Sequence, residues 1–446
     1  MKVTESSPPV QLDLAGSGPL PVAAAARPLS LYSNVAWIVA GNAVYAICQW
    51  GMIIALAKFG NSFMVGQFSL GLAVVTPVLM LSNLNLRAVQ ATDARRQFRF
   101  AEYLRLRLVL TLAGLAVIVG IVWFGGYGNK TAAIILALAA AKAIETLSDI
   151  HYGLFQLNDR LDQAGRSMIL RGGLAVAALS AGLYFMRNVF WGCIWMALAW
   201  VVTFFVFDVR RGKRLVACTE CGLETLTVER PGKIRLLFLA LPLGVVTTLA
   251  SINFHMPRYF IHAQMGEHEL GIFSALAYAT GSLTLVGDSL ATSAVPRLAR
   301  LYAGGMLAEY RTLVLRLLAV GCGIGLAGFE IARGMGARLL RIFYNADYAA
   351  YSRVFTVLMA AAALHFAASM LTSGITSARR FAIQVPLYLA VAAATAWGCA
   401  EWIPTLGLSG AAMGVTLGAA VRVLLAGAVM VYLLLPNSQR ERVLGQ

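Results

Sequence analysis

The stretch Ile-Ile-Leu-Ala-Leu-Ala-Ala-Ala, residues 134–141, contains no polar side chain, and neither does Val-Leu-Met-Ala-Ala-Ala-Ala-Leu, residues 357–364. A strand of a membrane barrel alternates apolar and polar residues over about 9–11 positions. A membrane-spanning helix needs about 20 predominantly apolar residues. Continuous apolar runs inside longer apolar segments therefore predict helices and exclude a barrel.

The composition extends this prediction to the whole chain. Of the 446 residues, 59% are hydrophobic and 13% are charged, against about 25% charged in soluble domains. Apolar segments of helix length recur twelve times. They occupy residues 30–57, 63–84, 105–124, 131–154, 168–186, 189–208, 236–262, 269–295, 312–330, 351–374, 381–403 and 407–435. We therefore predict an all-α polytopic membrane protein with about twelve transmembrane helices.

The longest internal connection divides the predicted spans into two sets of six. We expect a flexible cytoplasmic tail at 1–29, a six-helix bundle at 30–208, a cytoplasmic linker at 209–235, a second six-helix bundle at 236–435 and a cytoplasmic tail at 436–446. The second span of each half begins with a similar sequence, Gly66-Gln-Phe-Ser69 and Gly271-Ile-Phe-Ser274. Six is even, so the halves would be parallel repeats around a central cavity, which is a transporter architecture.

The cations predict the orientation of the chain. It carries 36 Lys and Arg against 20 Asp and Glu, a formal net charge of +16. With a cytoplasmic N-terminus, 26 of these cations lie inside, six outside and four within spans. This bias predicts cytoplasmic termini. It also indicates that the positive charge sets the membrane topology and contacts anionic lipids, and that it does not bind nucleic acid. Arg333, Arg338 and Arg341 are exceptions, so either the ninth span extends past Glu330 or its outer loop has a surface role.

Few ionisable residues lie inside the spans, where a charge costs at least about 2.5–3.5 kcal/mol. Lys142, Glu145 and Asp149 share one face of the fourth span, Asp288 lies in the eighth and Arg422 in the twelfth. One interpretation is a cavity in which Lys142 and Arg422 attract an anionic group while a carboxylate orients them or titrates. The alternative is that Lys142 pairs with Glu145, and Arg422 with Asp288, for structural reasons.

Other candidates carry weaker signals. Arg258, near the outer end of the seventh span, either extends to the membrane interface or contributes to substrate release. His365 in the tenth span is expected to hydrogen-bond between helices. Cys218 and Cys221 have metal-like spacing, but no second Cys or His pair accompanies them in that loop, so we predict no metal site and no cofactor.

Enzymatic signatures are missing from the sequence. There is no D-x-D pair for a nucleotide-sugar metal and no phosphate-binding loop of an ATPase. Internal connections are short, which leaves no room for a soluble catalytic domain. We therefore expect a secondary transporter or flippase rather than an enzyme.

Several segments of this chain resemble the Wzx-type polysaccharide flippases. They are Leu84–Asp93, Ala101–Arg107, Lys142–Gln156, Met256–Ile261, Glu269–Ala275, Val295–Tyr302, Tyr344–Tyr348 and Gly407–Ala412. The resemblance covers essentially the whole chain after residue 30. That family is the polysaccharide-transport branch of the MATE/MOP superfamily, which also contains multidrug-extruding MATE transporters and the lipid II flippase.

The resemblance implies a carrier in the bacterial inner membrane. It would move undecaprenyl-pyrophosphate-linked oligosaccharide from the cytoplasmic to the periplasmic leaflet by alternating access. Lys142, Arg422 and Arg258 would bind the diphosphate. Coupling to an H+ or Na+ gradient would fall to Asp288, Glu145 or Asp149. A polysaccharide polymerase and its assembly machinery are the expected protein partners.

Two alternatives stay open at this point. A MATE-like exporter of organic cations would need a buried carboxylate facing its substrate, and the first span, residues 30–57, contains no Asp or Glu. A polysaccharide polymerase would favour a large outer loop rich in Arg and His. The segment 331–350, with three arginines, fits that requirement only in part.

Overall fold

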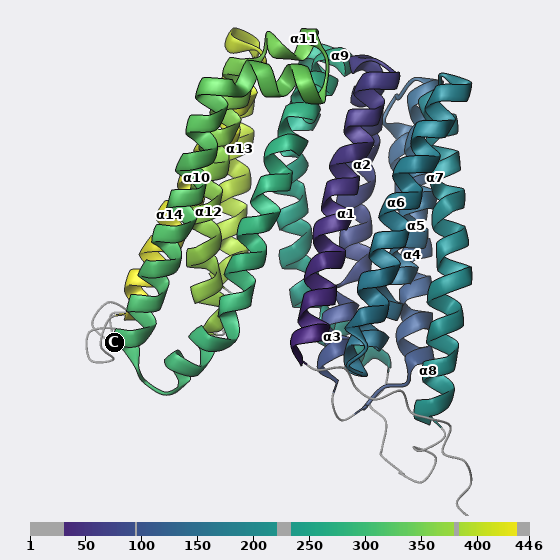
Figure 1. Ribbon diagram of the computed structural model, residues 1–446, viewed down its shortest axis with the longest axis vertical. Coiled ribbons are helices and arrows are strands. Elements are labelled where there is room, and N and C mark those ends of the chain that lie inside the picture. Colours follow the sequence, from purple (N-terminus) through teal and green to yellow (C-terminus); the bar gives the residue numbers. More distant parts are fainter. Residues whose placement is uncertain (1–30, 94–95, 221–232, 379–382, 435–446) are drawn as a thin grey trace, which may run out of the picture.

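The computed structural model describes residues 31–93, 96–220, 233–378 and 383–434. The first half contains α1 (Leu31–Phe59), α2 (Ser62–Asn83), α3 (Leu86–Thr92), α4 (Phe100–Phe124), α5 (Asn129–Leu157), α6 (Leu161–Met186), α7 (Val189–Thr203), the π-helical turn η1 (Phe204–Val209) and α8 (Arg210–Glu220). The second half contains α9 (Lys233–Ala303), α10 (Leu307–Phe343), α11 (Ala346–Ala349), α12 (Ser352–Ser377), α13 (Gln384–Leu406) and α14 (Leu408–Leu434). All regular elements of these described ranges are helices (Figure 1).

Among the described residues, ten helices are long and apolar enough to cross a membrane, which indicates a multi-pass membrane protein. One of them, Leu236–Ala303, is 68 residues long. Gly266 interrupts it with a left-handed φ of 85°, which only glycine adopts at no steric cost. The arms before and after Gly266 run antiparallel, so that the Arg258 guanidinium lies 5.1 Å from the Tyr278 ring centre. Together with α13, these helices cover all twelve predicted spans, and the predicted fold class is confirmed.

Two helices extend beyond the predicted boundaries. The ninth span was expected at 312–330, but α10 continues to Phe343, so the three outer arginines lie on a helical extension and not on a loop. The sixth span was expected to end at 208, but η1 leads into α8, which runs to Glu220. The expected linker therefore begins as a helix. Its residues 221–232, which include Cys221, and the expected tails 1–29 and 436–446 lie outside the described residues.

The two halves make their closest approach where α2 crosses α9. Gly66 of α2 lies against the backbone carbonyl of Glu267, and Gly271 of α9 lies against that of Ser62. A Cβ atom at either glycine would overlap those backbone atoms. Gly66 and Gly271 are the first residues of the two similar tetrapeptides. The sequence repeat therefore marks a reciprocal contact between corresponding helices.

Hydrogen bonds join the halves at the same end of the molecule. Trp50 Nε1 donates to Tyr344 Oη (2.7 Å). Asn345 Nδ2 donates to the Ala57 carbonyl (2.9 Å). We term this end, which carries Gly266, the closed end.

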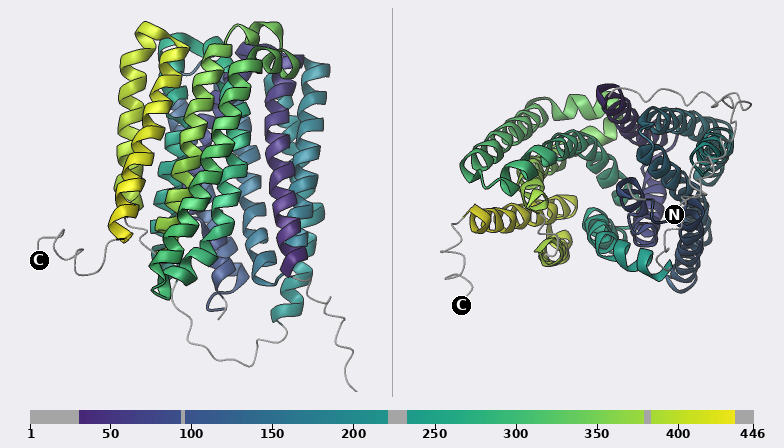
Figure 2. Two further views of the ribbon diagram at one scale, coloured as in Figure 1. Left: turned by 60° about the vertical axis from the view of Figure 1, so that its left-hand side comes forward. Right: turned by 90° about the horizontal axis from the view of Figure 1, so that it is seen from below.

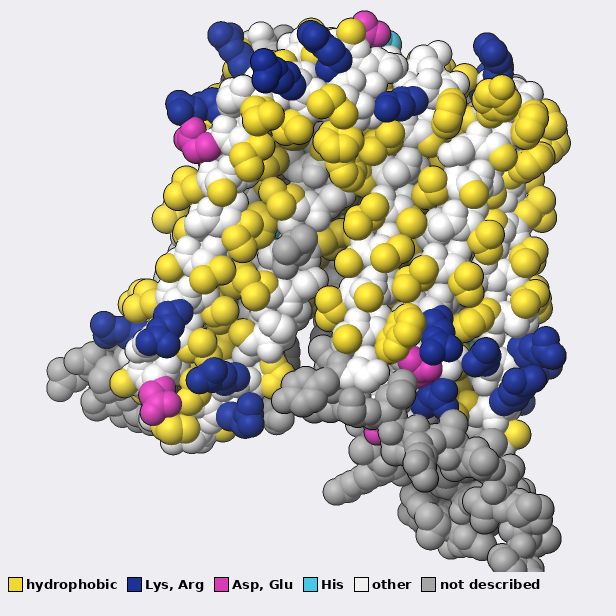
Figure 3. All heavy atoms as spheres, in the orientation of Figure 1, with side chains coloured by type: hydrophobic (Ala, Val, Ile, Leu, Met, Phe, Trp, Pro, Cys, Tyr) yellow, Lys and Arg dark blue, Asp and Glu magenta, His cyan; other side chains and the backbone are white. Residues whose placement is uncertain are grey.

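Toward the opposite, open end, α1 and the second arm of α9 diverge (Figure 1). The space-filling view shows a hollow between the halves there (Figure 3). Seen from that end, the N-terminal and C-terminal halves form two bundles (Figure 2, right). The arrangement is therefore asymmetric along its long axis. At the closed end the halves are hydrogen-bonded, whereas at the open end α1 and the second arm of α9 are apart and the first arm of α9 still packs against the first half, with Gly244 beside Leu84.

Replacement of Gly66 or Gly271 by Ala should force α2 and α9 apart. We expect each variant to lose about 1–3 kcal/mol of stability, as other overpacked sites do. Thermal unfolding in detergent measures this as a lower Tm. Gly120→Ala is the matched control, because an added Cβ on that residue of α4 meets no atom within 4 Å. Equal Tm values for Gly66→Ala and Gly120→Ala would contradict the close crossing.

Candidate functional site

The Glu145 carboxylate of α5 is the centre of a charged cluster in the first half. Lys142 Nζ lies 2.6 Å from its Oε2 atom, and Tyr45 Oη donates to its Oε1 atom (2.5 Å). Arg171 Nη2 lies 4.0 Å from the same Oε1. The expected Lys142–Glu145 pair is thus present, but two cations share one carboxylate. A second buried carboxylate, Asp208 of η1, lies near this cluster: Ser167 Oγ donates to its Oδ1 atom (2.6 Å) and contacts Tyr152 Oη (2.9 Å), over whose ring Arg171 lies.

Arg171 is the member of this cluster that sequence analysis missed. It is one of the 26 cations that the orientation count assigns to the cytoplasmic side, because it lies only three residues into the expected fifth span, 168–186. The helix α6 begins at Leu161 instead, which places Arg171 about three turns inside it. Its side chain is 3% exposed. The guanidinium lies 5.2–5.8 Å from the ring centres of three aromatic residues: Tyr45, Tyr152 and Trp200.

Asp149, two helical turns from Lys142, has separate partners. Arg87 Nη1 and Arg107 Nη2 each lie 3.3 Å from its carboxylate oxygens. Arg107 is 0% exposed and also donates to the side chain of Asn83. These ion pairs join α5 to α3 and α4. Asp149 therefore neutralises buried arginines instead of extending the Glu145 cluster.

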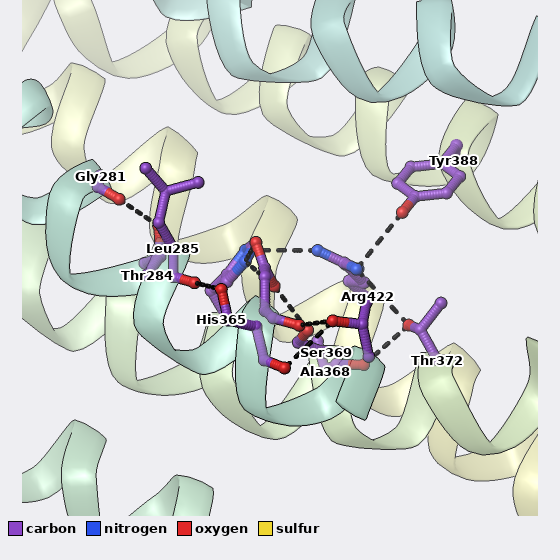
Figure 4. A network of polar contacts seen from close by, with 12 residues as sticks. Gly281, Thr284, Leu285, His365, Ala368, Ser369, Thr372, Tyr388 and Arg422 are labelled. Atoms are coloured by element: carbon purple, nitrogen blue, oxygen red, sulfur yellow. Dashed lines mark hydrogen bonds and ion pairs between the residues drawn. The ribbon is translucent and has the colours of Figure 1, made fainter. Parts of the chain in front are cut away.

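The second half contains a polar network that runs across the four helices α9, α12, α13 and α14 (Figure 4). Asp288 of α9 accepts a hydrogen bond from Ser369 Oγ (2.5 Å) and lies 3.1 Å from His365 Nε2. His365 Nδ1 lies 3.2 Å from Arg422 Nη1 of α14. Arg422 Nη2 in turn donates to Tyr388 Oη (3.3 Å). The direct Asp288–Arg422 pair that the sequence suggested is wrong, because the His365 imidazole stands between the two side chains.

Arg258, in the first arm of α9, is buried and lacks a counter-ion. Its side chain is 1% exposed, so it does not extend to the membrane interface. Nη1 donates to the carbonyl of Phe254 (2.7 Å), and the guanidinium lies over the rings of Phe254 and Tyr278. In the described part of the chain, Nε and Nη2 have no hydrogen-bond partner, and no carboxylate forms an ion pair with this arginine.

The segment of α9 around Arg258 packs against the first half. Tyr259, the next residue, donates to the backbone carbonyl of Ala73 in α2. His255, one turn before Arg258, is buried, and its Nδ1 atom has no partner among the described residues. Arg258 thus lies in the arm of α9 that borders the first half.

Metal-ligand geometry does not occur in this region. Across the described residues, no group of three or more His, Cys, Asp and Glu side chains could hold a metal ion. Most of the ionisable side chains described above are instead bonded to one another, whereas Arg258 and His255 have no ion-pair partner among the described residues. The arrangement is suited to binding an anion that enters between the halves.

Asp149→Asn should destabilise the protein because it leaves the buried Arg107 without an anionic partner. Breaking one side of a buried pair costs on the order of 3 kcal/mol, so we expect a clearly lower Tm. Asp159→Asn is the matched control, since Asp159 is exposed and has a left-handed φ of 53° that Asn adopts equally well. A Tm for Asp149→Asn equal to that of the control would contradict the structural role of Asp149.

The chain is similar to known proteins both in sequence and in fold. No protein-family model matches the chain. In sequence it is similar to the capsular polysaccharide biosynthesis protein CapF of Staphylococcus aureus, with 23% identity over 319 residues, which are 71% of this chain and 78% of that protein.

Two solved structures share the architecture over almost their whole length. One is an inward-facing multidrug resistance MATE transporter of the MOP superfamily, with a TM-score of 0.67 and 15% identity over 89% of this chain and 98% of that chain. The other is the lipid II flippase MurJ in an inward closed conformation, with a TM-score of 0.68 and 9% identity over 90% of each chain. These neighbours are transporters and flippases, not enzymes. The chain thus has the fold of these membrane proteins, and its resemblance to the polysaccharide-transport branch of the superfamily is confirmed.

Proposed function

We propose that this transporter is a flippase for undecaprenyl-pyrophosphate-linked oligosaccharide. The observation that carries the proposal is Arg258, a buried cation with no carboxylate partner among the described residues. Similarity to a capsular polysaccharide biosynthesis protein and to the lipid II flippase supports the same substrate class. The cargo would be a lipid whose headgroup begins with a diphosphate.

An unpaired buried charge costs on the order of several kcal/mol, which a structural role for Arg258 would not offset. A diphosphate supplies the missing negative charge and the acceptors for Nε and Nη2. Guanidinium and phosphate oxygens form charge-assisted, often bidentate hydrogen bonds. Lys142, which shares Glu145 with Arg171, would contribute a second positive charge from the opposite half.

The hollow between α1 and the second arm of α9 suits the rest of such a substrate. A hydrated sugar headgroup would enter the hollow, while the polyprenyl chain would stay in the lipid beside the gap. Lys142 lies about 20 Å from the start of α5 at the closed end, at 1.5 Å per residue. The headgroup would therefore meet the cations near the middle of the membrane.

The distribution of cations supports an orientation with the open end in the cytoplasm of a bacterial cell and the protein in its inner membrane. The open end carries α8, whose polar face holds Arg210, Arg211, Lys213 and Arg214. Such clusters are retained on the cytoplasmic side. Both termini would then be cytoplasmic. Substrate would load from the inner leaflet and leave after the contacts at the closed end separate.

Arg258→Gln should abolish transport without lowering stability. In proteoliposomes containing a fluorescent polyprenyl-diphosphate oligosaccharide, an impermeant quencher reports how much substrate has reached the other leaflet. We expect at least a tenfold lower rate for Arg258→Gln, because the diphosphate loses its principal cation, and a smaller loss for Lys142→Ala. The Tm of Arg258→Gln should be unchanged or higher, since no ion pair is broken.

Arg333→Ala is the control for charge, because this exposed arginine pairs only with Glu330 at the protein surface. It should move substrate at the rate of the unmodified protein. Normal flipping by Arg258→Gln would remove the anion-binding role. Uptake of an organic cation in place of the glycolipid would identify an exporter of the multidrug type.

A further inference from the structure

We propose that Nδ1 of His365 is a proton-binding site whose occupation releases the Arg422 guanidinium toward the transported anion. The proton site itself is inferred from geometry within the second half. Its second part, the use of the freed guanidinium, rests on the function proposed above. The ligand of this site is a proton, delivered from water, and no covalent step is involved.

The tautomer of His365 follows from its two neighbours. A guanidinium has five N–H donors and no acceptor. Arg422 Nη1, 3.2 Å from Nδ1, therefore donates to a lone pair on Nδ1. The remaining ring proton sits on Nε2, which faces the Asp288 carboxylate at 3.1 Å. The observed contacts thus correspond to a neutral imidazole held between an anion and a cation.

Protonation of Nδ1 would make the contact with Arg422 repulsive and would strengthen the contact with Asp288. An N–H on Nδ1 would point at the N–H of Arg422, so that two donors and two positive charges would face each other. The Asp288 carboxylate, by contrast, gains a salt bridge with the imidazolium. Arg422 would keep only Tyr388 Oη (3.3 Å) and the weaker contact with Thr372 Oγ1 (3.5 Å). The guanidinium is then free to turn to another anion.

Besides Asp288 and Arg422, the described helices that pack against α12 bring no other charged side chain to His365. The elements packed against α12 are α9, which supplies Asp288, α14, which supplies Arg422, and α10. Between Arg316 and Glu330, the part of α10 that contacts this level of α12 has no charged residue, and Cys322 is its titratable group. Along α12 the neighbours of the network are the hydroxyls of Ser369 and Thr372.

Two observations distinguish this network from the sites of Glu145 and Asp149: the exposure of its side chains and the kind of partner that its carboxylate has. The side chains of Asp288 and His365 are 42% and 31% exposed, on or beside the arm of α9 that borders the hollow. Glu145 is bound by Lys142, Arg171 and Tyr45, and Asp149 by two arginines. The ion-pair partners of those two carboxylates are lysine and arginine. Asp288 alone, of the three candidates, is bound by a histidine, whose ring nitrogens can accept or release a proton.

The consequence is reciprocal coupling between a proton and the anionic cargo. If protonation frees Arg422 for the diphosphate, then bound diphosphate must favour protonation of His365 to the same extent. A proton would therefore enter with substrate binding and leave when Arg422 returns to Nδ1. A pH difference across the membrane could bias the direction of transport through this exchange.

The binding of undecaprenyl diphosphate to the full chain in nanodiscs, measured by thermophoresis from pH 5.5 to 8.5, tests the coupling. We expect several-fold tighter binding at low pH for the unmodified protein and for His268→Gln, which removes an exposed histidine outside the network. In His365→Gln, which cannot be protonated, the change across the range should fall to less than twofold. The ligand is the same in all three measurements, so the titration of the diphosphate itself affects the three proteins equally. An equal pH dependence in His365→Gln would overturn the inference and leave the flippase proposal standing.

Nitrogen-15 NMR of labelled histidines tests the proton site without any substrate. The His365 signals, assigned by their loss in His365→Gln, should show a bare Nδ1 and a protonated Nε2 at pH 8.5. Arg422→Gln should leave a larger fraction of His365 doubly protonated at pH 7. A protonated Nδ1 at pH 8.5, or no response to Arg422→Gln, would overturn the proton site. Absence of diphosphate binding at every pH would instead overturn the proposed function and, with it, the use of the freed arginine.

Discussion

A guanidinium buried between packed helices must meet a negative charge or lose on the order of several kcal/mol. Asp149 supplies that charge to Arg107, and Glu145 supplies it to Lys142 and Arg171. Arg258 differs from these cations because its partners among the described residues are a backbone carbonyl and two aromatic rings, none of which carries a negative charge. This unmet charge is why the interface between the halves is suited to an anion that comes and goes.

The fold brings this charge to the arm of α9 that packs against the first half, near the closed end. Gly66 and Gly271 allow α2 and α9 to touch at the closed end, and the bonds of Trp50 and Asn345 hold that end together. The first arm of α9, which carries Arg258, runs from this contact toward the open end. Any rocking of the halves about the crossing would change the surroundings of Arg258 more than those of the internally paired carboxylates.

Much of this could be predicted from sequence because the membrane restricts the possibilities. Twelve apolar stretches predicted the helices, and charges inside those stretches identified Lys142, Glu145, Asp288 and Arg422 as a short set of candidates. Depth along a helix was the weak point. An error of seven residues at the start of α6 turned the buried Arg171 into a surface cation, and the end of α10 was placed thirteen residues too early. The position of His365 between Asp288 and Arg422 depends on side-chain contacts among three helices, which no spacing in the sequence encodes.

A structure of the protein with a polyprenyl-diphosphate oligosaccharide bound, determined in nanodiscs, would test the central claim most directly. The unpaired nitrogens of Arg258 should contact the diphosphate, with Lys142 beside it and the lipid chain leaving between α1 and the second arm of α9. A diphosphate bound away from both cations, or an Arg258 that stays buried and unpaired with substrate present, would contradict the account.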